Sequence, residues 1–388
     1  MDVVTSYLSL GLRLGRHVDG LVDAYFGPLE LAEQVESEEP RDPAELVADA
    51  VELLDELGGA GLEAQRTRWL RAQLVGLETV ARKLAGEQVS YEDEVERCYG
   101  IRPQRVREDV FAAAHEELDA ALPGAGPLAE RYHAWREGNG LQGKSLAGVV
   151  ESLTSDFRDR TEALVGLPAG ESIEVDYVSD EPWAAFNYYL GGLRSRIAVN
   201  TDVSLTPTFV TELIAHETYP GHHTEHTWKE ELFVKQRDQP EETILLIGTP
   251  QSTIAEGIAS LSAEVLLGDD EQEVTASHVA GLGVVYDAEV SRAVQRARVP
   301  LEDVPGNAAF LLHADGGSAE DAHAYLRRWG LHSEKRATQS VRFITDPVWR
   351  SYSTTYTDGR RVCRDWVAGD PSRFKRLLTE QLTPADLG

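Results

Sequence analysis

Histidines gather in one stretch of this chain, residues 209–231. The chain has eleven histidines, and those in the stretch are His216, His222, His223 and His226. Imidazole is the commonest protein ligand for zinc, and soluble chains rarely concentrate it without a metal. The stretch therefore indicates a metal site and the hydrolytic chemistry that a metal supports.

The histidine spacing departs from the familiar His-Glu-x-x-His motif, in which two histidines share one helix face. Glu217 does follow His216, but the residue four positions after His216 is Pro220, which cannot bind a metal. Pro220 cannot donate a helical hydrogen bond, and Gly221 tolerates unusual backbone angles. We therefore predict an interrupted helix whose bulge absorbs two residues, so that His222 takes the ligand position.

Two other histidines are alternatives for that second ligand. His223 shares a face of a regular helix with His216 but lies roughly 10 Å along its axis, a long reach for one ion. His226 follows His222 by one regular turn, but pairing these two would leave His216 and Glu217 without a role. We favour His222 and keep both alternatives open.

Carboxylates complete the predicted site. Glu217, beside a ligand, could take a proton from metal-bound water, whose pKa zinc lowers to roughly 7. A catalytic zinc commonly has three protein ligands. We predict Glu256 as the third, because it begins a mostly small, apolar helical run in which an unpaired carboxylate would be costly. Glu264, two turns later, is a weaker candidate that could hydrogen-bond to a ligand instead.

Tyrosines and arginines gather again near the end of the chain, between residues 342 and 366. Tyr356 or Tyr352 could donate a hydrogen bond to a developing oxyanion. Arg360 or Arg361 could pair with a substrate carboxylate. Aromatic packing with a charged rim is the structural alternative for all four residues.

The elements that must position these residues are mainly α-helical. Periodic apolar residues predict helices over residues 1–39, 42–87, 104–122, 126–138, 144–167, 248–267, 272–298 and 318–330. Residues 172–204 instead favour a hairpin around Gly191-Gly192, either purely structural or an edge that pairs with an extended peptide. We expect a large multi-helix, metallopeptidase-like fold with this small β-sheet beside the active-site helix. Residues 1–170 would form an N-terminal helical scaffold and 171–388 a zinc-binding catalytic region, together one two-lobed unit.

Composition limits the partners. The net charge is −29, with 66 acidic and 37 basic residues, which argues against nucleic acid or an anionic membrane as a partner. No segment has the roughly 20 apolar residues of a membrane span. Cys98 and Cys363 are far apart and form no disulfide scaffold, so we expect a reducing cytoplasm. A peptide or small molecule is the expected partner, and the oligomeric state is open.

The segment HETYPGHH at 216–223 resembles the His-Glu-x-x-Pro-Gly-His-His signature of the domain-of-unknown-function-885 family. That family is placed among gluzincin-type zinc metallopeptidases. Four shorter segments are also similar to the family in type and order: DAYFGPLE near the start, IAVNTD before the histidines, AEGIASLSAE and YTDG. These landmarks span most of the chain.

The resemblance implies one Zn²⁺ ion held by His216, His222 and Glu256, with Glu217 as the base. We expect Tyr356 to be a further catalytic residue. Thr224 and Ile258 depart from the family's usual Leu and Trp, and the Pro-Gly-Gln before the family's tyrosine is reduced to Asp346-Pro347. We expect a zinc-dependent metallohydrolase, a peptidase that cleaves short peptides. The alternatives are a hydrolase of a non-peptide amide or ester and a non-catalytic metal-binding protein of the same fold.

Overall fold

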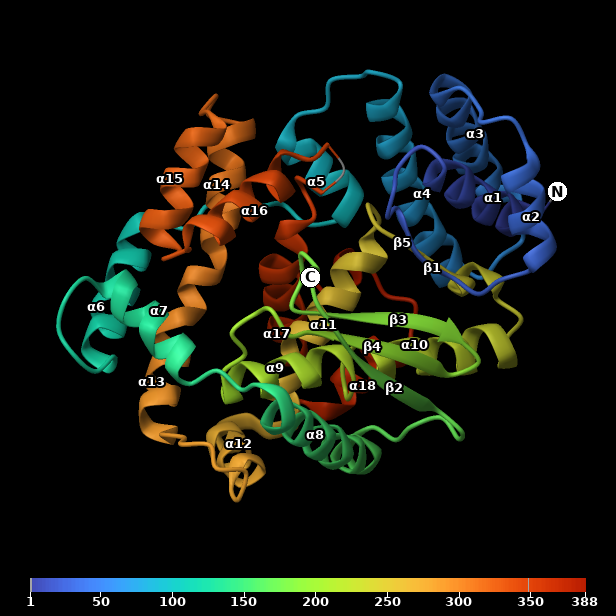
Figure 1. Ribbon diagram of the computed structural model, residues 1–388. Coiled ribbons are helices and arrows are strands. Elements are labelled where there is room, and N and C mark those ends of the chain that lie inside the picture. Colours follow the sequence, from blue (N-terminus) through green and yellow to red (C-terminus); the bar gives the residue numbers. More distant parts are fainter. Residues whose placement is uncertain (1, 348) are drawn as a thin grey trace.

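The computed structural model describes residues 2–347 and 349–388, and it is mainly helical with small sheets, as predicted (Figure 1). The first part of the chain is almost all helix. Its helices are α1 (Val3–Gly15), α2 (Leu29–Ser37), α3 (Pro43–Glu56), α4 (Ala64–Leu84), α5 (Tyr91–Tyr99), α6 (Glu108–Ala121), α7 (Leu128–Gly138) and α8 (Gly143–Leu164). Asp42 caps α3 by accepting from the Ala44 amide, with Pro43 at the first helical position, as the Asp-Pro pair favours.

The predicted hairpin is present and belongs to a three-stranded sheet. Strands β3 (Ala185–Gly191) and β4 (Arg194–Asn200) are antiparallel, while β2 (Ser172–Val178) runs parallel to β4, in the order β2-β4-β3. Gly191 and Gly192 both have positive φ, 69° and 65°, which the tight turns that suit strand twist require. Strand β3 therefore lies at an edge of this sheet.

A second sheet corrects one prediction. Residues 1–39 were expected to be helical throughout, but β1 (Val22–Tyr25) pairs antiparallel with β5 (Ile244–Leu246). The apolar spacing of Leu21 and Tyr25 continues that of α1, so periodicity alone did not reveal the strand. A partner more than two hundred residues away determines the local structure here.

The second half of the chain surrounds a central helix, α11 (Pro250–Leu267), which packs against α9 (Pro207–Glu217) and α17 (Arg360–Val367). Residues 272–298, predicted as one helical stretch, form two helices separated by a loop. Further elements of this half are α10 (His222–Lys229), α12 (Glu271–Val279), α13 (Ala288–Arg298), α14 (Val304–His313), α15 (Ala319–Trp329), α16 (Glu334–Thr345), the π-turn η6 (Thr355–Gly359) and α18 (Pro371–Thr379).

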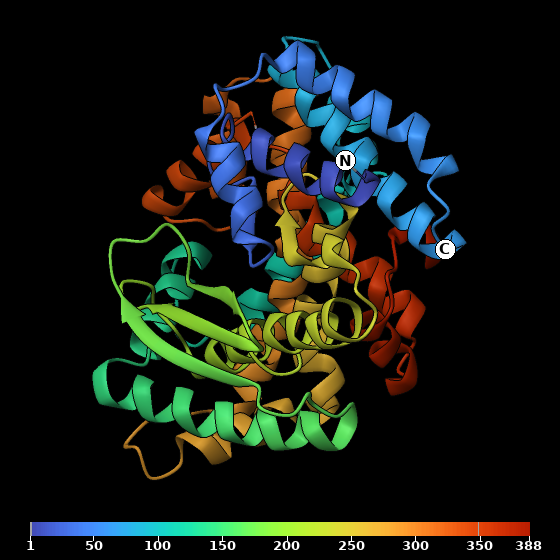
Figure 2. The same ribbon diagram turned by 90° about the vertical axis from the view of Figure 1, so that its right-hand side faces the viewer.

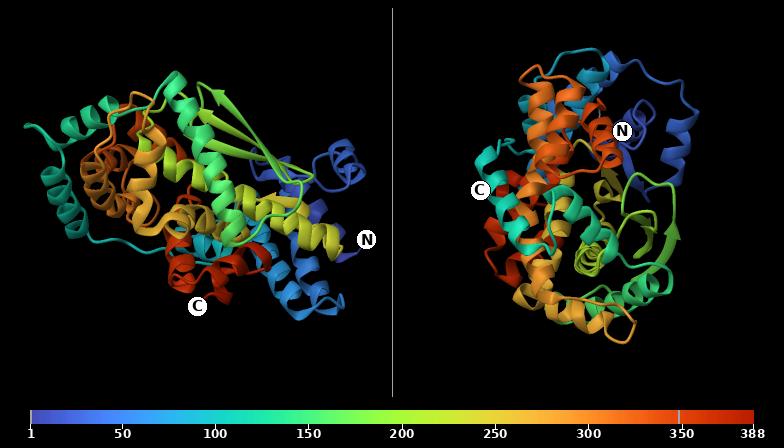
Figure 3. Two further views of the ribbon diagram at one scale, coloured as in Figure 1. Left: turned by 90° about the horizontal axis from the view of Figure 1, so that it is seen from below. Right: turned by 60° about the vertical axis from the view of Figure 1, so that its left-hand side comes forward.

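Hydrophobic clusters join distant parts of the chain. One cluster packs α5 and α6 against α13 to α16, and another packs α1, α3 and α4 against β5. Figure 2 shows the N-terminal helices at the top of the molecule and α8 below the three-stranded sheet, and Figure 3 shows teal α6 and α7 beside the orange helices. The first 170 residues thus share cores with the rest. In the part of the chain described, no helix is long and apolar enough to cross a membrane.

Candidate metal centre

The histidine-rich stretch forms two helices with a break between them. Helix α9 ends at Glu217, and α10 begins at His222. The predicted interruption at Pro220-Gly221 is therefore present, as a complete break rather than a bulge inside one helix. The Thr218 hydroxyl donates to the Ile214 carbonyl at 2.6 Å, and the Gly221 amide donates to the Ala215 carbonyl at 3.0 Å. These bonds satisfy carbonyls that the helix end would leave free.

Gly221 is needed at the break because the chain folds back on itself there. A Cβ at this position would lie 1.9 Å from the carbonyl oxygen of His216 and 2.5 Å from that of Ala215. No side chain fits such a gap. The missing side chain lets α10 begin against the end of α9, which brings His222 next to His216.

Three potential metal-binding side chains meet at this junction. His216, His222 and Glu256 each offer a ligand atom, and these atoms all lie within 4.8 Å of one another. The Nε2 atoms of His216 and His222 lie 3.5 Å and 3.8 Å from the two carboxylate oxygens of Glu256. Ligands about 2.1 Å from a tetrahedral ion are separated by roughly 3.4 Å. The spacing therefore suits a metal ion with little adjustment.

The protonation chemistry of these groups also suits a cation. Burial lowers the pKa of His216 to about 4 and lowers that of His222 well below its usual value, with the charge of His216 adding to the effect. Both imidazoles are therefore neutral at pH 7 and keep a lone pair for a metal. Oε2 of Glu256 is buried and has no hydrogen-bond partner in the described part of the chain, an arrangement that is costly unless a ligand satisfies it.

His223 points away from this group and is occupied elsewhere. Its side chain is fully buried, with Nδ1 2.8 Å from the Ser195 hydroxyl and Nε2 2.9 Å from Glu171. Both ring nitrogens are used, so His223 joins α10 to the sheet. Glu171 also accepts from the Tyr219 hydroxyl at 2.5 Å.

His226, the other alternative, lies behind His222 rather than among the three ligand atoms. The two rings stack with centroids 5.8 Å apart and planes only 5° from parallel. His226 also contacts Tyr189 of β3, with ring centroids 5.0 Å apart. This packing restrains the orientation of the His222 ring.

Glu217 lies at the end of α9 beside His216, and its side chain is buried. Burial raises the pKa of its carboxyl well above the usual value, and the charges of Glu256 and then Asp23 add to the rise. Its backbone carbonyl accepts a 2.7 Å hydrogen bond from the Asn187 side chain on β3. Strand β3 is thereby held against the end of α9.

The two candidate tyrosines have different surroundings. The Tyr352 hydroxyl donates a 2.6 Å hydrogen bond to Oε1 of Glu256, so this tyrosine contacts a potential ligand directly. Tyr356 packs edge-on against Tyr352, at 5.5 Å between ring centroids, and is 41% exposed. Burial by the surrounding protein raises the pKa of Tyr356, as do the charges of Glu256 and Glu217. Tyr356 thus remains accessible next to the carboxylates.

Two glycines hold the tyrosine segment against α11. A Cβ on Gly257 would lie 2.4 Å from the sulfur of Cys363 and 2.7 Å from the Gly359 carbonyl, and a Cβ on Gly359 would lie 2.7 Å from the Thr253 carbonyl. The backbones therefore touch beside Glu256. Gly359 ends the π-turn η6 that carries Tyr356, and such turns are frequent at functional sites.

The remaining sequence candidates lie outside this group. Glu264 forms ion pairs with Arg364 and Arg360, at 3.0 Å and 3.6 Å. Arg360 also contacts Glu302, and Arg361 pairs with Asp358 and Asp303. Each of these groups has an opposite charge as its partner, and Nε of Arg360 is buried without a hydrogen-bond partner among the described residues.

Asp23 is a nearby carboxylate that the sequence did not single out. It lies in β1, where the register with β5 shifts between Val22 and Ala24, and such bulges redirect side chains near active sites. Burial raises the pKa of Asp23 to about 6, and its charge acts on both Glu217 and Glu256. The only sequence signal was its place in the segment DAYFGPLE.

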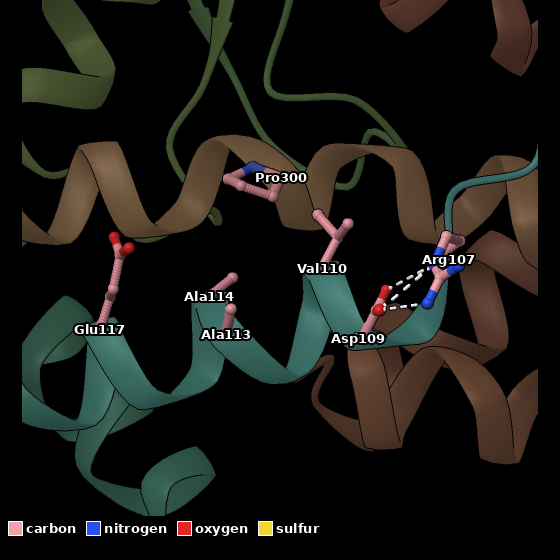
Figure 4. A pocket seen from close by; sticks show the side chains of 7 residues that line it. All are labelled: Arg107, Asp109, Val110, Ala113, Ala114, Glu117 and Pro300. Carbon is pink, nitrogen blue, oxygen red and sulfur yellow. Dashed lines mark hydrogen bonds and ion pairs between the residues drawn. The ribbon is translucent and has the colours of Figure 1, made fainter.

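A surface hollow of about 530 Å³ lies elsewhere, between α6 and Pro300. Figure 4 shows Arg107 paired with Asp109 at one end and Glu117 at the other, with Val110 and two alanines between them. This hollow contains none of the groups described above and adds nothing to the metal centre.

Comparisons with known proteins relate the fold to solved structures of low sequence identity. No family model and no curated protein matches the chain. The crystal structure of a "putative lipoprotein" from Colwellia psychrerythraea is similar at a TM-score of 0.55 and 15% identity, covering 92% of this chain and 68% of that one. One of unknown function from Shewanella oneidensis has a TM-score of 0.51 and 12% identity, covering 89% and 71%. These likenesses show a shared fold.

Proposed function

We propose that this chain is a zinc-dependent hydrolase that cleaves peptides. The observation that carries the proposal is the meeting of His216, His222 and Glu256 next to the buried carboxyl of Glu217. Two neutral imidazoles and one carboxylate are a ligand set that zinc hydrolases use, and a base adjacent to them completes the minimum machinery.

The groups around the ligands have separate roles in this proposal. Zinc, when bound, polarises a carbonyl and makes water a better nucleophile at neutral pH. Glu217 accepts a proton from the attacking water and passes it to the leaving amine, for which a raised carboxyl pKa is an advantage. Tyr356 donates a hydrogen bond to the oxygen that gains negative charge, while Tyr352 orients Glu256.

Strand β3 gives the proposed substrate a place to bind. It is one of the two edge strands of its sheet, and Asn187 connects it to the end of α9. An extended peptide could add to this edge through backbone hydrogen bonds, which would favour peptides over other amides or esters. Helices surround the centre, and we expect them to admit short peptides more readily than folded proteins.

Elemental analysis and peptide hydrolysis test the proposal together. We expect one zinc per chain and hydrolysis that a chelator abolishes and zinc restores. Glu217→Gln should retain zinc yet lower kcat by about 10²- to 10⁴-fold, the usual contribution of a general base. Glu264→Gln, which removes the same charge from a surface ion pair, is the matched control and should retain activity. Wild-type activity in the Glu217 variant would reject this residue as the base.

A set of peptides of increasing length tests the size limit. We expect kcat/KM to fall as the substrate lengthens and to be negligible for a folded protein. Equal rates across the set would remove the restriction to short peptides while leaving the hydrolase itself intact.

A further inference from the structure

Glu94, in helix α5, is a carboxylate with no exposed surface. Both of its oxygens accept hydrogen bonds. Oε1 accepts from the Lys83 ammonium at 2.5 Å and from the Ser351 hydroxyl at 2.6 Å, and Oε2 accepts from Nε of Arg350 at 2.7 Å. A carboxylate can be buried at little cost only when donors of this kind satisfy it. Glu94 therefore joins α5 to two residues that follow it by 256 and 257 positions in the chain.

Two further hydrogen bonds fasten the same stretch to the first part of the chain. The Lys83 ammonium also donates to the Pro347 carbonyl, and Nη2 of Arg350 donates to the Val89 carbonyl at 3.3 Å. Lys83 lies in the last turn of α4, and Val89 lies between α4 and α5. These anchors therefore fix the backbone just before Tyr352.

The anchored stretch leads directly to the metal centre. Ser351 precedes Tyr352, whose hydroxyl donates the 2.6 Å hydrogen bond to Oε1 of Glu256. Each residue from Glu94 to Glu256 in this series is thus hydrogen-bonded or covalently joined to the next. None of the four is more than 7% exposed, and close packing leaves such side chains little room for other positions. A shift of Ser351 would therefore move the tyrosine and the carboxylate that faces the two histidines.

Tyr99, the last residue of α5, gives this helix a second contact with the same group. Its ring packs edge-on against Tyr352, with ring centroids 6.1 Å apart. Its carbonyl accepts a 2.7 Å hydrogen bond from the Thr253 hydroxyl. Thr253 precedes Glu256 by three residues on α11, so the two side chains are neighbours on the helix surface. Helix α5 therefore contacts both the tyrosine that holds Glu256 and the helix that carries it. Figure 1 shows α5 above α11, between α4 and α16 in this view.

We propose that Glu94 is a positioning residue for the metal centre, because by holding Ser351 it keeps Tyr352 hydrogen-bonded to Glu256 and so raises the affinity of the protein for zinc. This inference rests on the proposed function for the identity of the metal, but not for the hydrolysis. A ligand that is already held in place needs less ordering when the metal binds. The first part of the chain would thus support the metal centre without contributing a ligand to it.

Ser351→Ala tests this link with the smallest change. It removes the hydrogen bond between Glu94 and the residue next to Tyr352, and it leaves the ion pairs of Glu94 in place. We expect zinc affinity, measured by competition with a chromogenic chelator, to fall about 2- to 30-fold, the usual range for residues that act through a neighbour. Glu94→Gln weakens the bonds to all three donors and should have a larger effect.

A double-mutant cycle distinguishes positioning from a general loss of stability. If Ser351 acts through Tyr352, adding Ser351→Ala to Tyr352→Phe should weaken zinc binding no further, because the hydrogen bond to Glu256 is already gone. Full additivity of the two effects would overturn the proposal, as would wild-type zinc affinity in Ser351→Ala. The serine variant decides the matter even if Glu94→Gln does not fold.

Glu241→Gln is the matched control for Glu94→Gln. Glu241 lies in the short helix η3 (Pro240–Thr243) and is also fully buried. Its two oxygens accept from Nε and Nη2 of Arg66, at 2.5 Å and 2.7 Å. This variant breaks a buried ion pair away from α5, so we expect it to lower the free energy of unfolding in denaturant and to keep the wild-type zinc affinity. A loss of zinc affinity as large as that of Glu94→Gln would overturn the proposal.

Zinc binding separates this inference from the hydrolase proposal. Zinc affinity that depends on Glu94 and Ser351, in a protein that hydrolyses no peptide, would support the positioning role and reject the hydrolase. Zinc-dependent hydrolysis, with equal zinc affinity in the wild type and in Ser351→Ala, would do the reverse. A wild-type protein that binds no zinc would reject both.

Discussion

The Tyr352 hydroxyl donates a 2.6 Å hydrogen bond to Oε1 of Glu256, the carboxylate that faces the two histidines. The bond fixes one oxygen of the carboxylate and leaves the other, Oε2, buried without a hydrogen-bond partner among the described residues. Residues that hold ligands in this way commonly contribute 10- to 100-fold to metal affinity.

We therefore expect Tyr352→Phe to weaken zinc binding by about 10- to 100-fold. Competition with a chromogenic chelator would measure the change. Tyr356→Phe removes the neighbouring hydroxyl, which makes no contact with Glu256 in the hydrogen bonds described, so its zinc affinity should stay near the wild-type value while its kcat falls. Equal zinc affinity in the two variants would contradict the proposal that Tyr352 holds Glu256 in position for the metal.

Adjacent histidines should behave differently when replaced. His222→Gln removes a proposed ligand, and we expect it to lose stoichiometric zinc. His223→Gln should keep zinc but unfold at lower temperature, because it breaks a buried network with Glu171 and Ser195, which typically costs about 1 to 3 kcal/mol. Zinc analysis and thermal unfolding of the two variants would show which histidine binds zinc and which stabilises the fold. Loss of zinc from the His223 variant alone would reverse the ligand assignment.

Gly221→Ala should disrupt the site through the backbone. Its methyl group would lie 1.9 Å from the His216 carbonyl oxygen, so the break must open and move His222. We expect a loss of stability of about 1 to 3 kcal/mol together with weaker zinc binding, measured by denaturant unfolding and chelator competition. Gly58→Ala is the control, since a Cβ there meets nothing within 4 Å. Normal zinc affinity in Gly221→Ala would show that the close approach does not position the ligand.

Zinc binding should release a proton near neutral pH. Burial raises the pKa of Glu256 to about 8 in the metal-free protein, with the charges of Asp23 and Glu225 adding to it and Tyr352 opposing it. At pH 7 the carboxyl is therefore mostly protonated, and a metal must displace that proton. The affinity of the protein for zinc should therefore rise as the pH increases toward 8 and level off above that pH.

Calorimetric titrations at pH 7 in two buffers of different ionisation enthalpy would count the protons released. We expect close to one per zinc in the wild type, because the neighbouring imidazoles are already neutral. Glu256→Gln is the control and should release fewer. A pH-independent affinity between pH 6 and 8 would contradict the prediction.

Local sequence was enough to single out three side chains that lie close together in the structure, His216, His222 and Glu256. The Pro-Gly pair interrupts the helix because of the intrinsic backbone properties of these two residues, and Glu256 stood out because it lies in an apolar run. Sequence could not decide between His222 and His223, since that depends on Ser195 and Glu171 reaching the second ring from other elements. It also missed β1, and with it Asp23, because that strand forms only when β5 is present to pair with it.

The contact between Gly257 and Gly359 has a consequence for how the proposed substrate would enter. Glu256 and the tyrosines belong to two backbone segments pressed together without room for a methyl group. These segments must travel as one piece during any opening of the proposed active site. We therefore expect any widening that admits a peptide to take place elsewhere, where β3 contacts β1 and α9.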